Sequence, residues 1–272
     1  MFNINDFNTL REKLASNSPL IHCITNPISI NDCANFVLAT GAKPIMAEHP
    51  LEVEEITSKA NALAVNIGNI TDARLKSIEL SAKKASELNI PWIIDIVGVN
   101  CSKLRFNYVK ELLDNLHPSV IKGNMSEIKA ISSIENHGKG IDVTKADATT
   151  NENISENILI AKNLANKYNT VVIASGKIDI ITDGNVVYTV ENGCEKMSLV
   201  TGTGCILNVL TGTMLSVAEP LTASVIAATL LGVAGELSDS NKGTGSFKIS
   251  LLDIVSTMTS ERMIEYAKIK CY

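Results

Sequence analysis

The stretch Ala62-Leu-Ala-Val-Asn-Ile-Gly68 is short and almost wholly apolar, and an amphipathic segment, 71–88, follows it directly. A second apolar run, Pro91-Trp-Ile-Ile-Asp-Ile-Val-Gly-Val99, comes next and is followed by another helical pattern at 103–116. Apolar runs separated by helix-length amphipathic segments are typical of a parallel sheet covered by helices on both faces. These residues therefore predict an α/β fold built of strand–helix–strand units.

The same alternation continues towards both ends of the chain. Apolar runs predict further strands at 19–25, 43–47, 119–123 and 170–174, and amphipathic segments predict helices at 29–40 and 52–60. Together these elements favour a three-layer α/β/α architecture with a mostly parallel central sheet.

The pattern changes in the last third of the chain. An Asp183-Gly-Asn185 turn between two short β runs predicts an antiparallel hairpin at 179–190. Beyond it we expect a helical C-terminal part, with Pro220 separating the first two of three helices at 205–217, 222–237 and 251–269. The main alternative, a (β/α)₈ barrel, fits this hairpin and helical end poorly. The polar segment 135–157 is expected to be an exposed loop.

Composition limits the domain count and the class of partner. The chain has 272 residues, 45% of them hydrophobic, with a mean hydropathy of +0.16. This is enough apolar material for one large core, so a single domain over 1–272 is expected. The 24 Lys and Arg against 29 Asp and Glu give a net charge of −5, and aromatic residues make up only 4%. Nucleic acid is therefore not an expected partner, because the chain lacks both a basic field and base-stacking platforms.

The spacing of the cysteines and the length of the apolar runs favour a cytoplasmic protein. The six cysteines and four histidines are scattered, without the paired spacing of a zinc site or a disulfide scaffold. Residues 1–13 are polar and acidic and lack the features of a secretory signal. The longest apolar run, 221–235, falls short of the roughly 20 residues that span a bilayer and is expected to be a buried helix. We expect a cytoplasmic protein with no membrane segment.

The stretch Thr201-Gly-Thr-Gly-Cys-Ile-Leu-Asn-Val-Leu210 is the first candidate for chemistry. Its glycines allow backbone amides to turn towards a ligand, and the helix behind them adds a partial positive charge. Gly202, Thr203 and Gly204 would then form an anion hole for a phosphoryl group. A tight turn entering a buried helix would give the same pattern. The chain has no Walker A sequence and no Gly-x-Gly-x-x-Gly after its first strand, which disfavours P-loop and Rossmann folds.

Cys205 lies in the first turn of the helix that follows these glycines. The helix dipole is expected to lower the pKa of its thiol, and a thiolate there could accept the proton of a substrate hydroxyl. The alternative is that Cys205 is a small buried hydrophobe, which is the usual role of a free cysteine.

Three charged residues lie in or directly after apolar strands. Asp95 interrupts an apolar run, where an acid needs a partner, and Glu127 follows the strand 119–123 at the start of a helix. Carboxylates at strand ends can hold hydrated Mg²⁺ over nucleotide phosphates, whereas Glu127 could also only complement the helix dipole. Lys122 could bind a phosphate or could be a solvated lysine at the strand end.

A set of motifs extends over nearly the whole chain: His22-Cys-Ile-Thr-Asn-Pro27, Asn31-Asp-Cys-Ala-Asn35, Gly41-Ala-Lys-Pro-Ile-Met-Ala47, Asn66-Ile-Gly68, Lys122-Gly-Asn-Met-Ser-Glu127, Val200-Thr-Gly-Thr-Gly-Cys205 and Gly243-Thr-Gly-Ser-Phe247. Together they resemble the hydroxyethylthiazole kinase family of the ribokinase-like superfamily. The combination is far more specific than any one string, and the Gly-Thr-Gly-Cys string is informative because most ribokinase relatives carry Asp where this family carries Cys.

The resemblance implies a fold, a reaction and a set of site residues. The family's reaction transfers the γ-phosphoryl group of ATP to the primary alcohol of 4-methyl-5-(2-hydroxyethyl)thiazole, in thiamine salvage. The resemblance also implies a homotrimer with the thiazole pockets between subunits. The residues that correspond by position are Asn26, Met46 and Gly202 for the thiazole alcohol, Lys122 and Ser175 for ATP, Asp95 and Glu127 for Mg²⁺, and Cys205 at the substrate hydroxyl.

Two positions depart from the family pattern. Position 122 is Lys where Arg is usual, which replaces a bidentate phosphate contact by a point charge, and position 175 is Ser where Thr is usual. The alternatives are a ribokinase-like kinase for hydroxymethylpyrimidine or pyridoxal, a nucleotide-dependent hydrate dehydratase on the same fold, and a sensor that binds a phosphorylated product. The first two are expected to carry Asp at position 205.

Overall fold

The computed structural model describes residues 4–132, 149, 153–238 and 242–272. Most of the loop expected at 135–157 lies outside these residues. Its expected end is wrong, because helix α7 already begins at Ile154.

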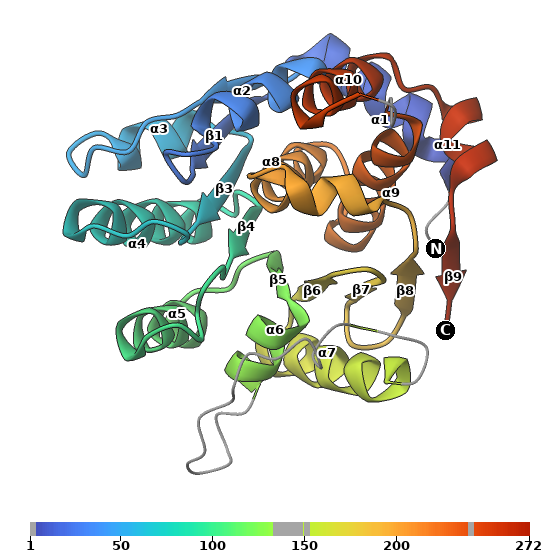
Figure 1. The fold of residues 1–272 in the computed structure, drawn as a ribbon. Coiled ribbons are helices and arrows are strands. Elements are labelled where there is room, and N and C mark those ends of the chain that lie inside the picture. Colours follow the sequence, from blue (N-terminus) through green and yellow to red (C-terminus); the bar gives the residue numbers. More distant parts are fainter. Residues whose placement is uncertain (1–3, 133–148, 150–152, 239–241) are drawn as a thin grey trace.

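A nine-stranded sheet, counted over the described residues, forms the centre of the molecule, with the strand order β2-β1-β3-β4-β5-β6-β7-β8-β9 (Figure 1). The first six strands in this order run parallel, and the last three are joined by antiparallel pairing. The strands are β1 (Leu20–Ile24), β2 (Lys43–Ile45), β3 (Ala62–Asn66), β4 (Trp92–Asp95), β5 (Val120–Asn124), β6 (Val171–Ser175), β7 (Asp179–Thr182), β8 (Val187–Val190) and β9 (Ile269–Cys271).

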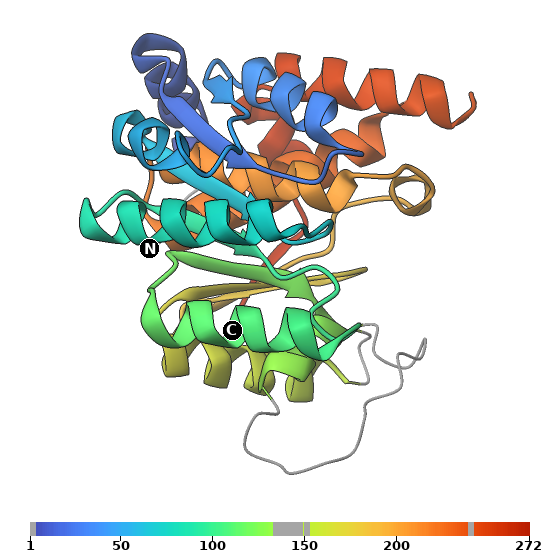
Figure 2. The same ribbon diagram turned by 90° about the vertical axis from the view of Figure 1, so that its left-hand side faces the viewer.

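Helices cover both faces of this sheet (Figures 1 and 2). One layer consists of α3 (Val53–Lys59), α4 (Asp72–Glu87), α5 (Lys103–Asn115), α6 (Met125–Ser132) and α7 (Ile154–Tyr168). The other consists of α1 (Phe7–Asn17), α2 (Ile30–Ala39), α8 (Thr203–Leu215), α9 (Pro220–Leu237), α10 (Thr244–Thr257) and α11 (Ser260–Tyr266).

Alternate residues of the strands face the two layers. In β6, Val171 and Ile173 pack in the core beneath α8 and α9, whereas Val172 and Ala174 pack in the core beneath α7. Because successive side chains of a strand point to opposite faces, strands buried on both sides are mostly apolar along their whole length. This confirms the three-layer α/β/α prediction, the mostly parallel sheet and the hairpin at 179–190.

The C-terminal prediction is wrong in two respects. The helix expected at 251–269 is two helices, because the chain turns at Met258 and the Thr259 side chain accepts a hydrogen bond from the amide of Arg262 to start α11. The chain then ends in β9, which pairs with β8, so the part after the hairpin is not only helical. Helix α1, which buries Phe7, was not expected from the sequence.

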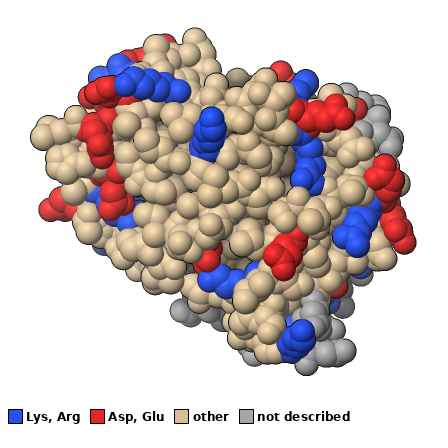
Figure 3. Space-filling view, turned by 90° about the horizontal axis from the view of Figure 1, so that it is seen from above, with Lys and Arg blue, Asp and Glu red and all other residues tan. Residues whose placement is uncertain are grey.

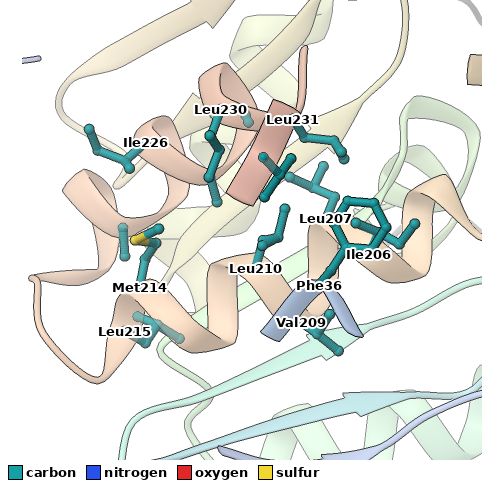
Figure 4. Close-up of a cluster of buried hydrophobic side chains, with 14 of the residues drawn as sticks. Phe36, Ile206, Leu207, Val209, Leu210, Met214, Leu215, Ile226, Leu230 and Leu231 are labelled. Atoms are coloured by element: carbon teal, nitrogen blue, oxygen red, sulfur yellow. The ribbon is translucent and has the colours of Figure 1, made fainter. Parts of the chain in front are cut away.

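Helix α9 is long and apolar enough to cross a membrane by length and composition, yet 72% of it is buried in the fold. Figure 4 shows its Leu230 and Leu231 beside Leu207 and Leu210 of α8. Helix α8 in turn lies close on the sheet, since a Cβ added at Gly212 would come within 2.9 Å of Ala64 in β3. The two helices are thus core helices, and they fix the N-terminus of α8 over the sheet.

Candidate active site

The candidate residues converge at one edge of the sheet because parallel strands end on the same side. Asn26, Asp95 and Ser175 come at or just after the carboxyl ends of β1, β4 and β6, and Lys122 lies in β5 between them. In open α/β sheets this edge is where ligands bind. The N-terminus of α8 reaches the same edge, since Gly204 lies beside Lys122.

The loop 202–204 is a tight turn that starts helix α8. Gly202 has φ +98°, a left-handed conformation that glycine adopts without strain, and its carbonyl accepts the amide of Ile206 to begin α8. The Thr203 hydroxyl donates to the carbonyl of Met197 over 3.2 Å, which ties the loop to the preceding turn. A Cβ added at Gly202 would lie 3.2 Å from the Cβ of Ser29, so the loop also packs against the start of α2.

Lys122 and Asp95 form a buried ion pair beside this loop. The Nζ of Lys122 lies 2.9 Å from Oδ2 of Asp95, and both side chains are almost fully buried. Burial is the largest single effect on the pKa of Lys122 and lowers it, but the charge of Asp95, the hydrogen bond to Asp95 and the charge of Glu127 together raise the pKa overall. A Cβ added at Gly204 would lie 3.6 Å from the same Nζ. A fixed positive charge therefore adjoins the amides of the loop.

The thiol of Cys205 is not activated in the way that the sequence indicated. Burial raises its pKa, and the nearby charge of Asp95 raises it further, whereas a hydrogen bond with Ser29 and the charge of Lys122 lower it. The expected lowering by the helix dipole is wrong because desolvation of a thiolate is the larger effect. Cys205 is therefore a neutral, partly buried thiol at pH 7, and its Sγ lies 3.6 Å from Nδ2 of Asn66.

The two carboxylates differ in how much room they leave for a metal ion. Both oxygens of Glu127 accept backbone amides, from Gly98 and Asn124, each over 2.7 Å. Burial raises the pKa of Glu127, although these amide bonds lower it. Asp95 has a buried Oδ1 without a hydrogen-bond partner among the described residues.

This donor set suits a hydrated ion. Among the residues that the structure describes, no three His, Cys, Asp or Glu side chains cluster as metal ligands. Mg²⁺ usually keeps several waters and binds through one or two carboxylates together with substrate phosphates. The free Oδ1 of Asp95 and the outer lone pairs of Glu127 fit that mode of binding.

A cavity of about 1170 Å³ lies next to the loop, on the side of the antiparallel strands. Ser175, Thr203 and Gly204 line one end, and the α9 residues Leu231 and Gly232 line another part. The Ser175 hydroxyl also donates to the carbonyl of Gly123 over 3.3 Å. The other candidates, Cys205, Lys122, Asn26 and Met46, do not line this cavity.

The two remaining candidates lie on the side of β1 and β2. Asn26 approaches Gly68, since a Cβ added at Gly68 would lie 2.9 Å from its Nδ2. Met46 is half-buried and packs against the same hydrophobic core as Cys205. Its segment is held by His22, whose Nε2 lies 2.9 Å from the carbonyl of Ala47 and must donate to it. No direct contact between Asn26, Met46 and Gly202 is recorded.

Three further residues at this edge were not expected from the sequence to take part in the site. Asn66 contacts both Asp95 and Cys205, and its position in an apolar strand could have singled it out as it did Asp95. Arg105 reaches from α5 to the carbonyls of Ile67 and Gly68, but nothing in its sequence context distinguishes it from a surface arginine. Asp179 lines the cavity and accepts the amide of Gly176 over 2.8 Å.

Solved structures of low sequence identity share the fold of this chain. A pyridoxal kinase from Staphylococcus aureus, solved with AMP-PCP and pyridoxal, matches with a TM-score of 0.64 over 93% of this chain and 98% of its own, at 13% identity. This likeness shows a common fold, the ribokinase-like one.

Closer matches identify the family. The model of the hydroxyethylthiazole kinase family matches residues 11–261. Hydroxyethylthiazole kinase 2 of Clostridium botulinum (strain Hall) is 51% identical over 97% of this chain and 99% of its own length. The solved structure of a hydroxyethylthiazole kinase protein from Pyrococcus horikoshii OT3 has a TM-score of 0.87 at 32% identity, covering 97% of this chain and 98% of that one. The chain belongs to the hydroxyethylthiazole kinase family.

Proposed function

We propose that this chain, as a single kinase domain in the cytoplasm, transfers the γ-phosphoryl group of ATP to the primary hydroxyl of 4-methyl-5-(2-hydroxyethyl)thiazole, in thiamine salvage. The observation that carries the proposal is the Lys122 ammonium, held by Asp95 beside the loop 202–204 at the N-terminus of α8. A helix N-terminus with a fixed cation beside it stabilises the charge of a phosphoryl group in transfer.

ATP would occupy the cavity of about 1170 Å³, with its phosphates towards Ser175 and the loop. The amides of Gly202, Thr203 and Gly204 would bind the transferred group, and Lys122 would neutralise part of its charge. When bound, Mg²⁺ would neutralise the phosphate oxygens and orient them, and Asp95 and Glu127 would hold it through water.

Cys205 would orient the substrate hydroxyl. In a loose phosphoryl-transfer transition state the alcohol loses its proton late, so a strong base is not required. A neutral thiol whose pKa is raised by burial fits this demand as a hydrogen-bonding partner of the hydroxyl. Asn26, Met46 and Gly202 would form the thiazole site, where the adaptable thioether of Met46 suits a neutral ring.

The thiazole site is proposed to be completed by a neighbouring subunit in a homotrimer. Ile28 and Leu51, which follow Asn26 and Met46 closely in the sequence, are 70% and 92% exposed. The face in Figure 3, which includes α2 and α10, has a wide area without charged side chains between its charged groups. Large exposed apolar side chains such as Ile28 and Leu51 support an interface with another copy of the chain.

The test is a coupled ADP-release assay with ATP, Mg²⁺ and the thiazole alcohol, with hydroxymethylpyrimidine and pyridoxal in parallel. ADP release that depends on the thiazole alcohol and stops with EDTA is the expected result. Turnover of only one of the other alcohols would show that this alcohol, and not the thiazole alcohol, is the substrate. Phosphate release without a phosphorylated alcohol would indicate a dehydratase, and binding of the thiazole phosphate without turnover would indicate a sensor.

A further inference from the structure

Asn66 is the one side chain recorded in contact with both the Cys205 thiol and the buried ion pair, among the residues described. It is the last residue of β3 and is 0% exposed. Its Nδ2 lies 2.9 Å from Oδ2 of Asp95 and 3.6 Å from Sγ of Cys205. Its Oδ1 accepts the amide of Gly68 over 2.8 Å.

These partners fix the orientation of the carboxamide. The amide of Gly68 can only donate, so the atom facing it must be Oδ1. The carboxylate of Asp95 accepts, so the atom facing it must be Nδ2. Nδ2 carries two hydrogens, and with one directed to Asp95 the other is available to the sulfur of Cys205.

We propose that Asn66 is a positioning residue for phosphoryl transfer, which holds the Cys205 sulfur in register with the Asp95–Lys122 pair through its two Nδ2 hydrogens. Because the sulfur accepts from Asn66, the S–H of Cys205 is directed away from the Nδ2 of Asn66. The thiol group of Cys205 is thereby held in one orientation, towards the substrate hydroxyl beside the loop 202–204. The proposal rests on the proposed function, since it assigns Asn66 a role through Cys205 in that reaction.

A second buried asparagine at the same place offers a matched control. Asn208 lies one turn after Cys205 in α8 and is also 0% exposed. Its Nδ2 donates to the carbonyl of Val65, the residue before Asn66, over 3.1 Å, and no contact to Cys205 is recorded. Both variants, Asn208→Asp and Asn66→Asp, therefore introduce the same acid at equal burial. Only Asn66→Asp removes a hydrogen-bond donor to the sulfur of Cys205.

The experiment is a double-mutant cycle of Asn66→Asp and Cys205→Ala, with kcat and KM measured for the thiazole alcohol. Cys205→Ala alone is expected to lower kcat about 10²-fold without abolishing it, and Asn66→Asp to lower kcat about 10–100-fold with little change in KM. In the Cys205→Ala background, Asn66→Asp should lower kcat less than about threefold further. Equal losses in both backgrounds, or full kcat in either single variant, would overturn the proposal. If Asn66→Asp does not fold, Asn66→Ala enters the same cycle.

A readout independent of turnover separates this proposal from the proposed function. The rate of alkylation of Cys205 by iodoacetamide, followed on the peptide by mass spectrometry, is expected to fall about tenfold in Asn66→Asp, because a donor to the sulfur favours its reactive thiolate. Asn208→Asp should leave that rate unchanged. An unchanged or faster rate in Asn66→Asp would contradict the contact. If the chain fails to phosphorylate the thiazole alcohol, the alkylation result still decides whether Asn66 controls the sulfur.

Discussion

At the scale of single residues, Lys122 and Asp95 depend on each other because neither can be solvated. Removing one partner of a buried ion pair leaves an uncompensated charge and typically lowers stability by about 3–5 kcal/mol. Lys122→Met is therefore expected to lower the free energy of unfolding by roughly that amount, measured by urea denaturation. Lys59→Met, which breaks the exposed pair with Glu55, should change it by less than about 1 kcal/mol.

A second variant separates charge burial from packing. The double change Lys122→Met with Asp95→Asn removes both charges of this pair and should recover much of the stability lost in Lys122→Met, because a buried pair can often be replaced without loss. Activity should not recover, since the cation beside Gly204 is absent. A double variant as unstable as Lys122→Met would show that packing of the lysine stem, and not the charge of Asp95, accounts for the loss.

Asp179 predicts a pH dependence of stability. Burial raises its pKa to about 7, although the Gly176 amide and the charge of Lys122 lower it. Between pH 4 and pH 7 the unfolded chain loses this proton while the folded chain keeps it, so the contribution of Asp179 to stability falls as pH rises. Asp179→Asn should therefore be more stable than the wild type at pH 8, by roughly 1–3 kcal/mol, and equal to it near pH 3.5.

The measurement is the difference in unfolding free energy between the two proteins across this pH range. Because all other groups titrate in both proteins, their contributions cancel in this difference. Asp253→Asn, which neutralises an exposed carboxylate on α10, is the control. A difference that does not grow between pH 4 and pH 7 would show that Asp179 is ionised throughout in the folded protein.

At the scale of elements, the start of α8 depends on a left-handed residue. Gly202→Ala places a Cβ at φ +98°, which costs about 1–2 kcal/mol, and 3.2 Å from Ser29, so the loop must shift. We expect a loss of stability of that size and a larger relative loss of kcat, because the loop amides are displaced. The measurements are thermal unfolding and steady-state kinetics.

The control for this prediction is Gly245→Ala. Gly245 lies in α10 with open space around its added Cβ, so alanine there should stabilise the helix by up to about 1 kcal/mol and leave kcat unchanged. Wild-type kcat in Gly202→Ala would show that the amides of this loop do not contact the transferred group.

The elements that the sequence predicted correctly have a strong local signal. β1, β3 and β4 are mostly apolar because they are buried on both faces, and each has a single polar residue, so their positions follow from composition. The errors fall where the signal is weak or non-local. β9 is three residues long and forms only because β8 offers an unpaired edge, and α1 has a short apolar stripe whose partners are at the other end of the chain.

At the scale of the whole molecule, the site could be predicted only in part. The positions of Asp95, Lys122 and Gly204 near one another follow from parallel strands that end at one edge. Their electrostatics do not, because the desolvation that raises the pKa of Cys205 depends on how α2, α8 and the sheet pack together. The role of Arg105 depends likewise on where α5 lies relative to β3.

Leu51→Asp tests whether a second subunit completes the thiazole site. If the thiazole site is shared between subunits, a charge at the 92%-exposed Leu51 would be buried in the interface, and Leu51→Asp should dissociate the trimer. The isolated chain should keep its fold and lose most activity at low protein concentration, because half of the substrate pocket would be missing. Sedimentation velocity and activity as a function of protein concentration measure both effects.

Leu159→Asp is the matched control, since Leu159 is 58% exposed on α7, which packs on β6 and β7, far along the sheet from β2. This variant should keep the mass of the trimer and full activity, because the same change of an exposed leucine to a charge then falls outside the interface. A trimeric and active Leu51→Asp would place the interface elsewhere. A monomeric variant with full activity at every concentration would show that one chain holds the whole site, and that trimers, if present, serve stability instead of catalysis.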